Sequence, residues 1–293
     1  MHGGKRLAER DGYAVIDCTA CGWAHLDPLP DEAELARMYA SSYYEDSDGW
    51  LEKDRAEAAF WDLEHADKLA DWAALLGAET GTLVDVGCSG GLLIEYAASR
   101  GWHASGIEPS TLAVAECRRL GLAVIEGRYQ DVELEGEVDV IHAKLVLEHL
   151  HDPPAFVAWA HRALRRGGVL TLQAPNEFTA LQLAARAALD LEPWWVAPPF
   201  HLNYFDFASL ERLLTAGGFA PAGRDATYPM EWFLLAGEDY VRDPHLGADC
   251  HGRRMRLELA LEPLGERRAL HRDLAARGLG REAIVHARRV SPS

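Results

Sequence analysis

The sequence predicts an α/β fold, a doubly wound and mostly parallel sheet with helices on both faces. Between residues 82 and 173, short apolar runs alternate with segments of helical period. This alternation is typical of parallel strands joined by crossover helices. The first run, Thr82–Val86, ends in the glycine-rich turn Gly87–Gly91. The second run, Ala104–Ile107, ends in Glu108, roughly 20 residues after the first glycine, which is the spacing of a nucleotide-binding unit.

Residues that start or stop helices bound these elements. Ser110 is a good N-cap, and Gly121 is suited to the C-terminal end of the same helix. The expected strands are Gly12–Asp17, Thr82–Val86, Ala104–Ile107, Ala123–Glu126, Val138–His142, Val169–Gln173, Ala220–Thr227 and Ala283–Arg288. The expected helices are two in 31–76, then Leu92–Arg100, Thr111–Leu120, Pro154–Arg165, Ser209–Ala216 and inserted helices in 230–275.

The glycine turn and Glu108 predict a site for an adenine nucleoside at the carboxyl ends of the strands. Glycines let the backbone approach a ligand, and the acid after the second strand accepts ribose hydroxyls. A dinucleotide site favours G-x-G-x-x-G, whereas this turn reads G-x-x-G-G with Asp85 two residues before it. A carboxylate there disfavours a pyrophosphate and suits an ammonium or sulfonium group. The expected cofactor is S-adenosylmethionine, and an NAD-dependent oxidoreductase is the weaker alternative.

The region from Gly81 to Phe219 resembles the class I S-adenosylmethionine-dependent methyltransferases. The resemblance rests on DVGCSGG (85–91), GIEPS (106–110), VDVIHAKLVLEHLHDP (138–153) and LRRGGVLTLQAPN (164–176), in this order. It implies a Rossmann-like sheet of seven strands whose last strand is antiparallel. It also implies five segments: a truncated ribbon-like lead-in (1–30), a helical lid (31–80), the S-adenosylmethionine-binding core (81–228), a helical insertion serving as substrate lid or dimer contact (229–280), and the last strand with its tail (281–293).

The lead-in contains half of a possible zinc site, Cys18-x-x-Cys21-Gly22. A structural zinc ion normally has four ligands, often from two C-x-x-C pairs. The chain resembles a group of bacterial methyltransferases that open with a zinc ribbon, through Cys18, Cys21, Gly22, Pro28, Pro30, Tyr43 and Tyr44. A first C-x-x-C pair is missing, and His2 and His25 complete a site only imperfectly. The sequence therefore favours a metal-free hairpin, and no metal is predicted.

Twelve residues are expected to bind the cofactor. Glu108 is assigned to the ribose, and Asp85 and Gly87 to the methionine end. Tyr129 and Gln130 follow the third strand, where the family contacts adenine. The full set is Tyr44, Asp85, Gly87, Cys88, Ser89, Gly90, Glu108, Pro109, Tyr129, Gln130, Lys144 and Leu145. For Tyr44, aromatic packing is the alternative to a role as lid.

Two histidines are candidate catalytic bases, His149 in LVLEHLHDP and His201 in PPFHLNYF. A histidine titrates near neutral pH and can take the acceptor's proton as the methyl group arrives. In ubiquinone-pathway O-methyltransferases a similar Glu-His pair holds a divalent metal together with an upstream acid. Leu145 occupies the matching upstream position here, which argues against a metal. A structural role is the alternative for both histidines.

Bulky aromatic residues beside prolines suggest the wall of an acceptor pocket. The expected substrate-binding residues are Trp194, Trp195, Tyr204, Tyr228 and Glu231. Packing alone is an equal explanation for Tyr228 and Glu231. In zinc-ribbon methyltransferases that act on nucleotide-linked sugars, a Tyr-x-Glu-His run occurs around the position of His201. Phe200 replaces its Glu here, which favours O- or N-methylation over C-methylation.

The composition narrows the class of partner. The formal net charge is −17, which disfavours a nucleic-acid partner and favours a small-molecule acceptor such as a sugar or natural-product intermediate. Five cysteines without a disulfide pattern suit a reducing cytoplasm, and no apolar run is long enough to span a bilayer. The expected function is methyl transfer to O or N, or to C, of that acceptor, with a homodimer as one option. A non-catalytic S-adenosylmethionine-binding protein is the main alternative.

Overall fold

The computed structural model describes residues 2–31, 49–134 and 137–290. The chain divides into two compact units. Unit 1 consists of residues 1–30, 174–210 and 224–285, and unit 2 consists of residues 31–173, 211–223 and 286–293. Among the described helices, none combines the length and the apolar character that crossing a membrane requires.

A seven-stranded sheet is the main element of the fold, with the strand order β10-β11-β8-β7-β4-β5-β6. Its strands are β4 (Thr82–Val86), β5 (His103–Glu108), β6 (Val124–Glu126), β7 (Val138–Lys144), β8 (Leu164–Pro175), β10 (Phe219–Ala226) and β11 (Glu282–Arg289). Five neighbouring strands of the sheet are mutually parallel, in the order β8-β7-β4-β5-β6. The predicted doubly wound, mostly parallel sheet is therefore confirmed, and every strand of it except β8 lies within two residues of its expected range.

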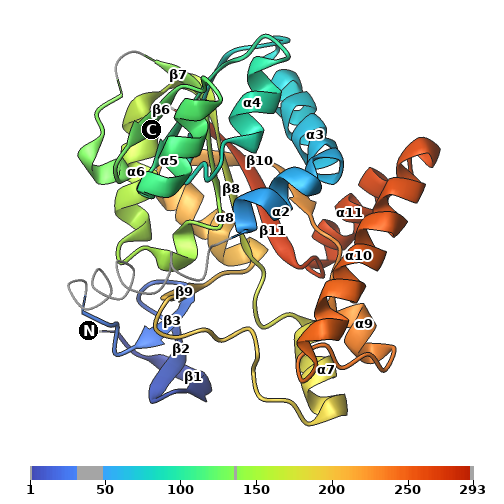
Figure 1. The fold of residues 1–293 in the computed structure, drawn as a ribbon. Helices are drawn as coiled ribbons and strands as arrows, with labels where there is room; N and C mark the ends of the chain where they lie inside the picture. The colour runs from blue at the N-terminus through green and yellow to red at the C-terminus, as the bar shows by residue number, and fades with distance from the viewer. Residues whose placement is uncertain (1, 32–48, 135–136, 291–293) are drawn as a thin grey trace. The chain divides into compact units, whose positions relative to one another are not determined.

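The helices of the sheet region also lie close to their predicted positions (Figure 1). They are α2 (Trp50–Ala56), α3 (Ala58–Leu76), α4 (Leu92–Ala98), α5 (Thr111–Arg119), α6 (Pro153–Ala163), α8 (Phe207–Ala216) and the 3₁₀ turns η3 (Tyr129–Asp131) and η4 (Leu147–His149). The Ser110 side chain accepts a hydrogen bond from the N–H of Ala113, as expected of an N-cap.

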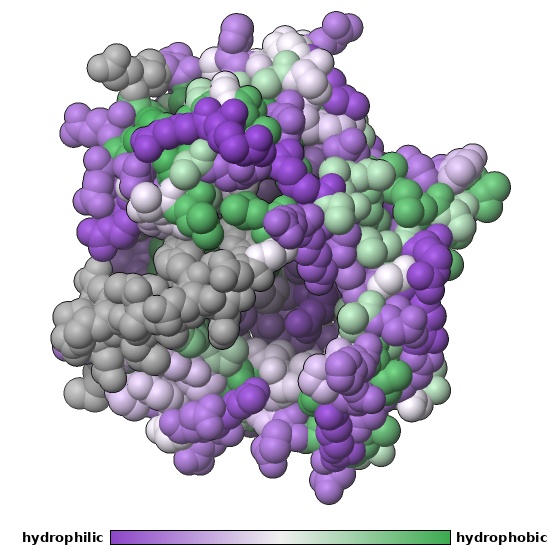
Figure 2. Space-filling view, in the orientation of Figure 1, coloured by the Kyte–Doolittle hydropathy of each residue, from purple (hydrophilic) through white to green (hydrophobic). Residues whose placement is uncertain are grey.

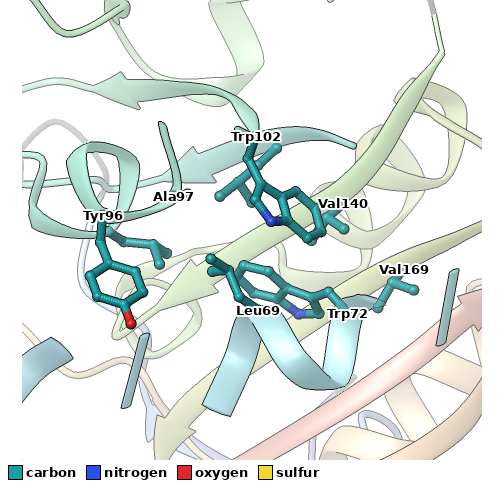
Figure 3. Packing of buried hydrophobic residues seen from close by; sticks show 9 residues of the cluster. Leu69, Trp72, Tyr96, Ala97, Trp102, Val140 and Val169 are labelled. Carbon is teal, nitrogen blue, oxygen red and sulfur yellow. The ribbon is translucent and has the colours of Figure 1, made fainter. Parts of the chain in front are cut away.

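The core of unit 2 is built where α3 and α4 pack on the sheet. Figure 3 shows the rings of Trp72 and Trp102 next to each other, beside Val140. The two ring centroids are 6.0 Å apart in an edge-to-face arrangement. Trp72 is fully buried, and its indole N–H donates to the Thr171 hydroxyl at 2.8 Å. A buried indole normally needs such a partner, so this bond fixes the position of α3 against β8.

The boundary between α6 and β8 differs from the prediction. The helix was expected to continue to Arg165, but it ends at Ala163 and the strand begins at Leu164. Leu164 pairs with Val138, and the Arg165 guanidinium binds the Asp139 carboxylate at 2.5 Å, which holds this segment against β7. The register then shifts before Val169. Gly167, at φ 74°, permits this irregularity. Leu164 and Arg165 were assigned to the helix because both residues are good helix formers.

Unit 1 contains a second, four-stranded sheet in the order β1-β2-β3-β9 (Figure 1). Its strands are β1 (Gly4–Arg10), β2 (Tyr13–Cys18), β3 (Ala24–Asp27) and β9 (Asn203–Tyr204), paired antiparallel. Its helices are α7 (Ala180–Leu189), α9 (Glu231–Leu235), α10 (Pro244–Leu261) and α11 (Glu266–Arg277), with the turn η5 (Glu262–Leu264). The sequence analysis missed α7, although Thr179 and Gln182 form a capping box at its start.

Candidate cofactor site and acceptor-side residues

The turn after β4 requires glycine at two positions. Gly87 has φ 72°, its N–H donates to the Ile107 carbonyl at 2.8 Å, and a Cβ there would lie 2.7 Å from Val146 Cγ2. A Cβ on Gly90 would lie 2.5 Å from Cδ2 of Leu51, on α2. The turn is thus packed between Val146 and α2, so a larger residue at either position must displace the Val146 or the Leu51 side chain.

Glu108 is held between two backbone amides. Its Oε2 accepts the N–H of Ser89, in the glycine turn, at 2.9 Å, and its Oε1 accepts the N–H of Ser110 at 2.9 Å. Burial raises the pKa of Glu108, and these two N–H groups partly offset that rise. Each carboxylate oxygen keeps a second lone pair for another donor. The carboxylate is therefore oriented to accept two further hydrogen bonds at the end of β5.

Asp85 is buried at the end of β4 and bound to a residue that the sequence analysis did not select. His142, on the neighbouring strand β7, contacts Asp85 Oδ1 through Nδ1 at 2.7 Å. Burial lowers the pKa of His142 despite the adjacent carboxylate. A neutral imidazole leaves Asp85 as the net negative group at this edge of the sheet. The pairing of the two strands places the residues in register, so His142 was detectable once β4 and β7 were predicted as neighbours.

Two further predicted cofactor residues, Lys144 and Leu145, lie at the carboxyl end of β7. Leu145 adopts φ 55°, and its N–H donates to the Gln173 carbonyl at 2.8 Å. Lys144 lies over the ring of Trp61 at 4.3 Å and reaches Glu64 Oε2 at 3.4 Å. Both partners of Lys144 are on α3, which sequence reasoning had not linked to the site.

The side chains of Cys88 and Tyr129 point into the protein core. Cys88 is buried beside Ile94, and a Cβ on Gly106 would lie 2.3 Å from its Sγ. The Tyr129 ring packs edge-on against Phe156 at 4.9 Å. Only the backbone of each of these two residues, and not its side chain, is therefore placed to contact a cofactor.

The remaining predicted cofactor residues are exposed or lie outside the described part. Pro109 and Gln130 are exposed, next to the buried residues Ser110 and Tyr129. Ser89, at φ 54°, is part of the glycine turn. Tyr44 lies outside the described residues. Pro109 follows β5 and Gln130 follows β6, so the predicted cofactor residues that the structure describes lie along the carboxyl ends of β4, β5, β6 and β7 in unit 2.

His149 is in η4, directly after β7. Its side chain is 20% exposed, and its Nε2 is 3.9 Å from Oε1 of the buried Glu148. Since Val146, at the start of η4, contacts the position of Gly87, this histidine is near the glycine turn. His149 thus follows the carboxyl end of β7, the strand that also carries Lys144.

In unit 1, the predicted aromatic residues form one packed group. The rings of Trp194 and Trp195 are 4.7 Å apart, and Phe178 contacts both Trp195 and Tyr204 at 5.6 and 6.0 Å. The Tyr204 hydroxyl accepts the N–H of Ala197 at 3.3 Å. The ring of His201 is 6.5 Å from that of Tyr204.

A second group in unit 1 is charged and buried. The Arg281 guanidinium binds Glu231 Oε1 at 3.2 Å, and Glu177 Oε2 accepts the side-chain amide of Gln182 at 2.6 Å. Burial raises the pKa of Glu177 to about 7. Burial alone would lower the pKa of Arg281, but Glu231 and Glu177 raise it. Tyr228, the last predicted substrate residue, stacks edge-on against Trp232 at 5.0 Å, next to Glu231.

Sequence reasoning missed Glu177 and Arg281. Glu177 lies four residues after the expected strand Val169–Gln173, and this position near a strand end was the available signal. Arg281 lies in an arginine-rich segment, and the sequence does not indicate which of these guanidinium groups is buried.

The sequence profile of a methyltransferase domain family matches residues 57–222, more than half of the chain. The chain therefore belongs to this methyltransferase domain family. The match covers β4, the glycine turn, Glu108 and the strands that follow, and so includes the cofactor candidates Asp85 to Leu145. The predicted class of protein, a methyltransferase, is confirmed at the level of this family.

Among curated proteins, the chain is similar to ubiquinone biosynthesis O-methyltransferases. It is 33% identical over 159 residues to the protein of Pseudomonas paraeruginosa, a match that covers 50% of this chain and 64% of that protein. It is 37% identical over 113 residues to the protein of Methylococcus capsulatus, covering 35% of this chain and 46% of that protein. The chain thus spans less than two thirds of the length of these relatives.

Solved structures share the fold. The magnesium protoporphyrin IX methyltransferase of Synechocystis PCC 6803 aligns with a TM-score of 0.54 at 15% identity, over 88% of this chain and 100% of that one. The 1,6-didemethyltoxoflavin-N1-methyltransferase of Burkholderia thailandensis aligns with a TM-score of 0.53 at 15% identity, over 98% and 100%. At this identity the likeness concerns the fold, and it confirms the predicted Rossmann-like methyltransferase architecture.

Proposed function

We propose that the chain transfers the methyl group of S-adenosylmethionine to an oxygen of a small-molecule acceptor. The observation that carries this proposal is the Glu108 carboxylate, oriented by Ser89 and Ser110 beside the glycine turn, in a chain of the methyltransferase domain family. The similar proteins that are named O-methyltransferases favour oxygen as the accepting atom. Nitrogen is the second candidate, since its methylation needs the same positioning, and carbon is the third.

The residues present fit this cofactor. Glu108 accepts the ribose hydroxyls with its remaining lone pairs, and Asp85 supplies a negative charge for the methionine ammonium. The backbone of Gly87 to Gly90 provides close approach where a Cβ would collide with neighbouring side chains. When bound, the cofactor supplies a methyl group activated by an adjacent sulfonium. The protein's part is then to hold the acceptor in line, which contributes about 7–11 kcal/mol to lowering the barrier.

We assign the role of base to His149, with His201 as the alternative. The partly exposed His149 imidazole can take the acceptor's proton, and the buried Glu148 carboxylate beside it stabilises the charge that results. His201 belongs to unit 1, near Tyr204, which is predicted to bind the acceptor. Proton removal of this kind contributes about 10²–10⁴-fold to the rate.

We place the acceptor-binding residues in unit 1: Trp194, Trp195, Tyr204, Tyr228 and Glu231. The aromatic group around Phe178 supports a rigid apolar wall, and the charged group of Glu231 and Arg281 supports recognition of a polar substituent. Glu177 joins this assignment, because a carboxyl with a pKa of about 7 can donate or accept a hydrogen bond near neutral pH.

We also retain three proposals about the surroundings of the enzyme. The net charge of −17 supports an acceptor other than nucleic acid, and a location in the cytoplasm agrees with the cysteine content. A homodimer is supported by apolar side chains on the helical hairpin α10–α11, whose exposed leucines are Leu257, Leu259 and Leu264. Figure 2 shows this apolar surface in green on the hairpin at the right.

The test is formation of S-adenosylhomocysteine from S-adenosylmethionine in the presence of a panel of phenols, catechols, sugars and amines. We expect product with hydroxyl acceptors, and a kcat lowered about 10²–10⁴-fold in His149→Asn with an unchanged KM for the cofactor. His151→Asn, two residues further along, is the control and should keep wild-type kcat. If His201→Asn loses kcat and His149→Asn does not, the base is His201. Tight binding of S-adenosylmethionine without turnover on any acceptor class supports the non-catalytic alternative.

A further inference from the structure

Four potential metal ligands of unit 1 meet at one end of the small sheet. His2 precedes β1, Cys18 ends β2, Cys21 lies in the following turn and His25 is in β3. One ligand atom from each residue, a thiol sulfur or an imidazole nitrogen, lies within 4.8 Å of all the others. Residues far apart in the sequence are brought together here by strand pairing, because Gly4 pairs with Cys18 and Ile16 with His25.

The separations suit a tetrahedral ion. Zn–S bonds of about 2.3 Å and Zn–N bonds of about 2.0–2.1 Å put tetrahedral ligand atoms roughly 3.3–3.8 Å apart. His2 Nδ1 is 3.3 Å from the sulfur of Cys21 and 3.7 Å from the sulfur of Cys18. The His2 and His25 rings are perpendicular, with centroids 4.9 Å apart. The remaining separations between the ligand atoms are also within 4.8 Å.

His25 is oriented as metal-binding histidines usually are. Its Nδ1 is 2.7 Å from the Leu26 carbonyl, which fixes the proton on that nitrogen and leaves the lone pair on Nε2. The side chain is only 3% exposed, and Nε2 is buried with no hydrogen-bond partner among the residues that the structure describes. Leaving such an acceptor unsatisfied costs about 1–3 kcal/mol, so a ligand for Nε2 removes that cost.

The backbone holds the four ligands together. Both the N–H and the hydroxyl of Thr19 donate to the Gly3 carbonyl at 3.1 Å, which ties the His2 segment to the turn that bears the cysteines. A Cβ on Gly4 would lie 1.8 Å from the Asp17 carbonyl, so glycine is required for this close approach. Gly22, at φ 82°, lets its N–H donate to the Cys18 carbonyl at 2.8 Å and closes the turn.

We propose that His2, Cys18, Cys21 and His25 bind one structural Zn²⁺ ion. Two thiolates and two imidazoles in a tetrahedral arrangement are a ligand set that selects zinc, and four protein ligands leave no open position for catalysis. The two thiols release their protons to solvent on binding. A metal-free hairpin was expected from the sequence because a first C-x-x-C pair is missing; the fold places the imidazoles of His2 and His25 beside the two thiols instead.

The ion would brace the strand that carries predicted acceptor residues. His25 pairs with Asn203 and Ala24 with Tyr204, so β3 supports β9 directly. The Trp23 indole also donates to the Asn203 side chain at 2.9 Å. The zinc proposal is independent of the proposed function, since it can be tested through metal content alone.

The experiment measures zinc in the full chain, purified under reducing conditions, loaded with Zn²⁺ and dialysed against a weak chelator. We expect one zinc per chain in the wild type, and loss of that zinc in His2→Ala, Cys21→Ser and His25→Ala. Replacement by Co²⁺ should give a thiolate-to-cobalt charge-transfer band and the intense visible bands of tetrahedral Co²⁺. His103→Ala and Cys250→Ser, outside the cluster, are the controls and should keep one zinc.

His2→Ala is the decisive variant, since His2 is exposed and lies outside every strand, so its removal leaves the fold intact. Circular dichroism of each variant identifies any that fails to fold. A wild-type chain that retains no zinc and shows no charge-transfer band overturns the proposal. Zinc that is retained by both His2→Ala and His25→Ala overturns it as well, because the ion then has other ligands.

Discussion

Replacing Glu108 by glutamine should remove most of the affinity for the cofactor. Both carboxylate oxygens already accept a backbone N–H, from Ser89 and from Ser110, each at 2.9 Å. The new side-chain NH₂ group must therefore face one of these N–H donors, whichever way the amide is turned. The substitution keeps the shape of the side chain while it removes the charge and one acceptor.

The size of the effect follows from the bonds that are lost. A hydrogen bond to a charged group contributes about 1.5–3 kcal/mol and one between neutral groups about 0.5–1.5 kcal/mol, so losing one ribose bond and the charge from the other costs about 2.5–4.5 kcal/mol. Since each 1.4 kcal/mol corresponds to about a tenfold change, the dissociation constant should rise by roughly 10²–10³-fold. Burial raises the pKa of Glu108, so this carboxylate takes up a proton at a higher pH than an ordinary glutamate does. The affinity of the wild type for the cofactor should therefore begin to fall at that higher pH as the solution is acidified.

The assay is calorimetric titration with S-adenosylhomocysteine at neutral pH. Glu126→Gln is the matched control, because Glu126 pairs with Glu108 in the neighbouring strand but binds Thr111 and Arg118 on the surface. We expect wild-type affinity for that control. If folded Glu108→Gln binds with wild-type affinity, the assignment of Glu108 to the ribose is wrong.

Four further substitutions test the packing and the buried charges by urea unfolding. Gly87 and Gly121 both have a left-handed φ, so alanine at either position should lower the free energy of unfolding by about 1–2 kcal/mol. Only the Cβ of Gly87→Ala meets a neighbouring side chain, so this variant should lose about 1–3 kcal/mol more. Equal losses in the two variants would contradict the close packing of the turn. Burial raises the pKa of Glu177 in the folded protein to about 7. As pH rises from the pKa of an ordinary glutamate to above 7, the unfolded chain releases this proton first, so the free energy of unfolding of the wild type should fall by about 3 kcal/mol. Glu177→Gln should lack that fall, and an unchanged pH profile would contradict it. Trp72→Phe should cost about 1–3 kcal/mol through the lost bond to Thr171, and a neutral effect would show that the bond is unimportant.

The sequence predicted the sheet well because its signals are local. Thr82–Val86 is an apolar run ended by glycine, and the observed strand has the same bounds. Ser110 was predicted as a cap from its position alone, and it caps α5. Glu108 was found from its distance along the chain to the glycine turn, a spacing that the strand–helix–strand unit imposes.

The rest depended on contacts between distant segments. His142 becomes important only because β7 pairs with β4, and Trp61 and Glu64 because α3 lies against Lys144. The short strand β9 exists because β3 is available for pairing, which its own two residues do not reveal. For Tyr129, the position in the chain was informative, but the direction of the side chain was set by the aromatic core.

The most direct test of the account is calorimetric titration of the wild-type chain with S-adenosylmethionine and, separately, with NAD. The arrangement of Asp85, Gly87 and Glu108 predicts micromolar binding of S-adenosylmethionine and no binding of NAD. Binding of NAD alone, or of neither ligand by the folded protein, would contradict the proposed methyltransferase function.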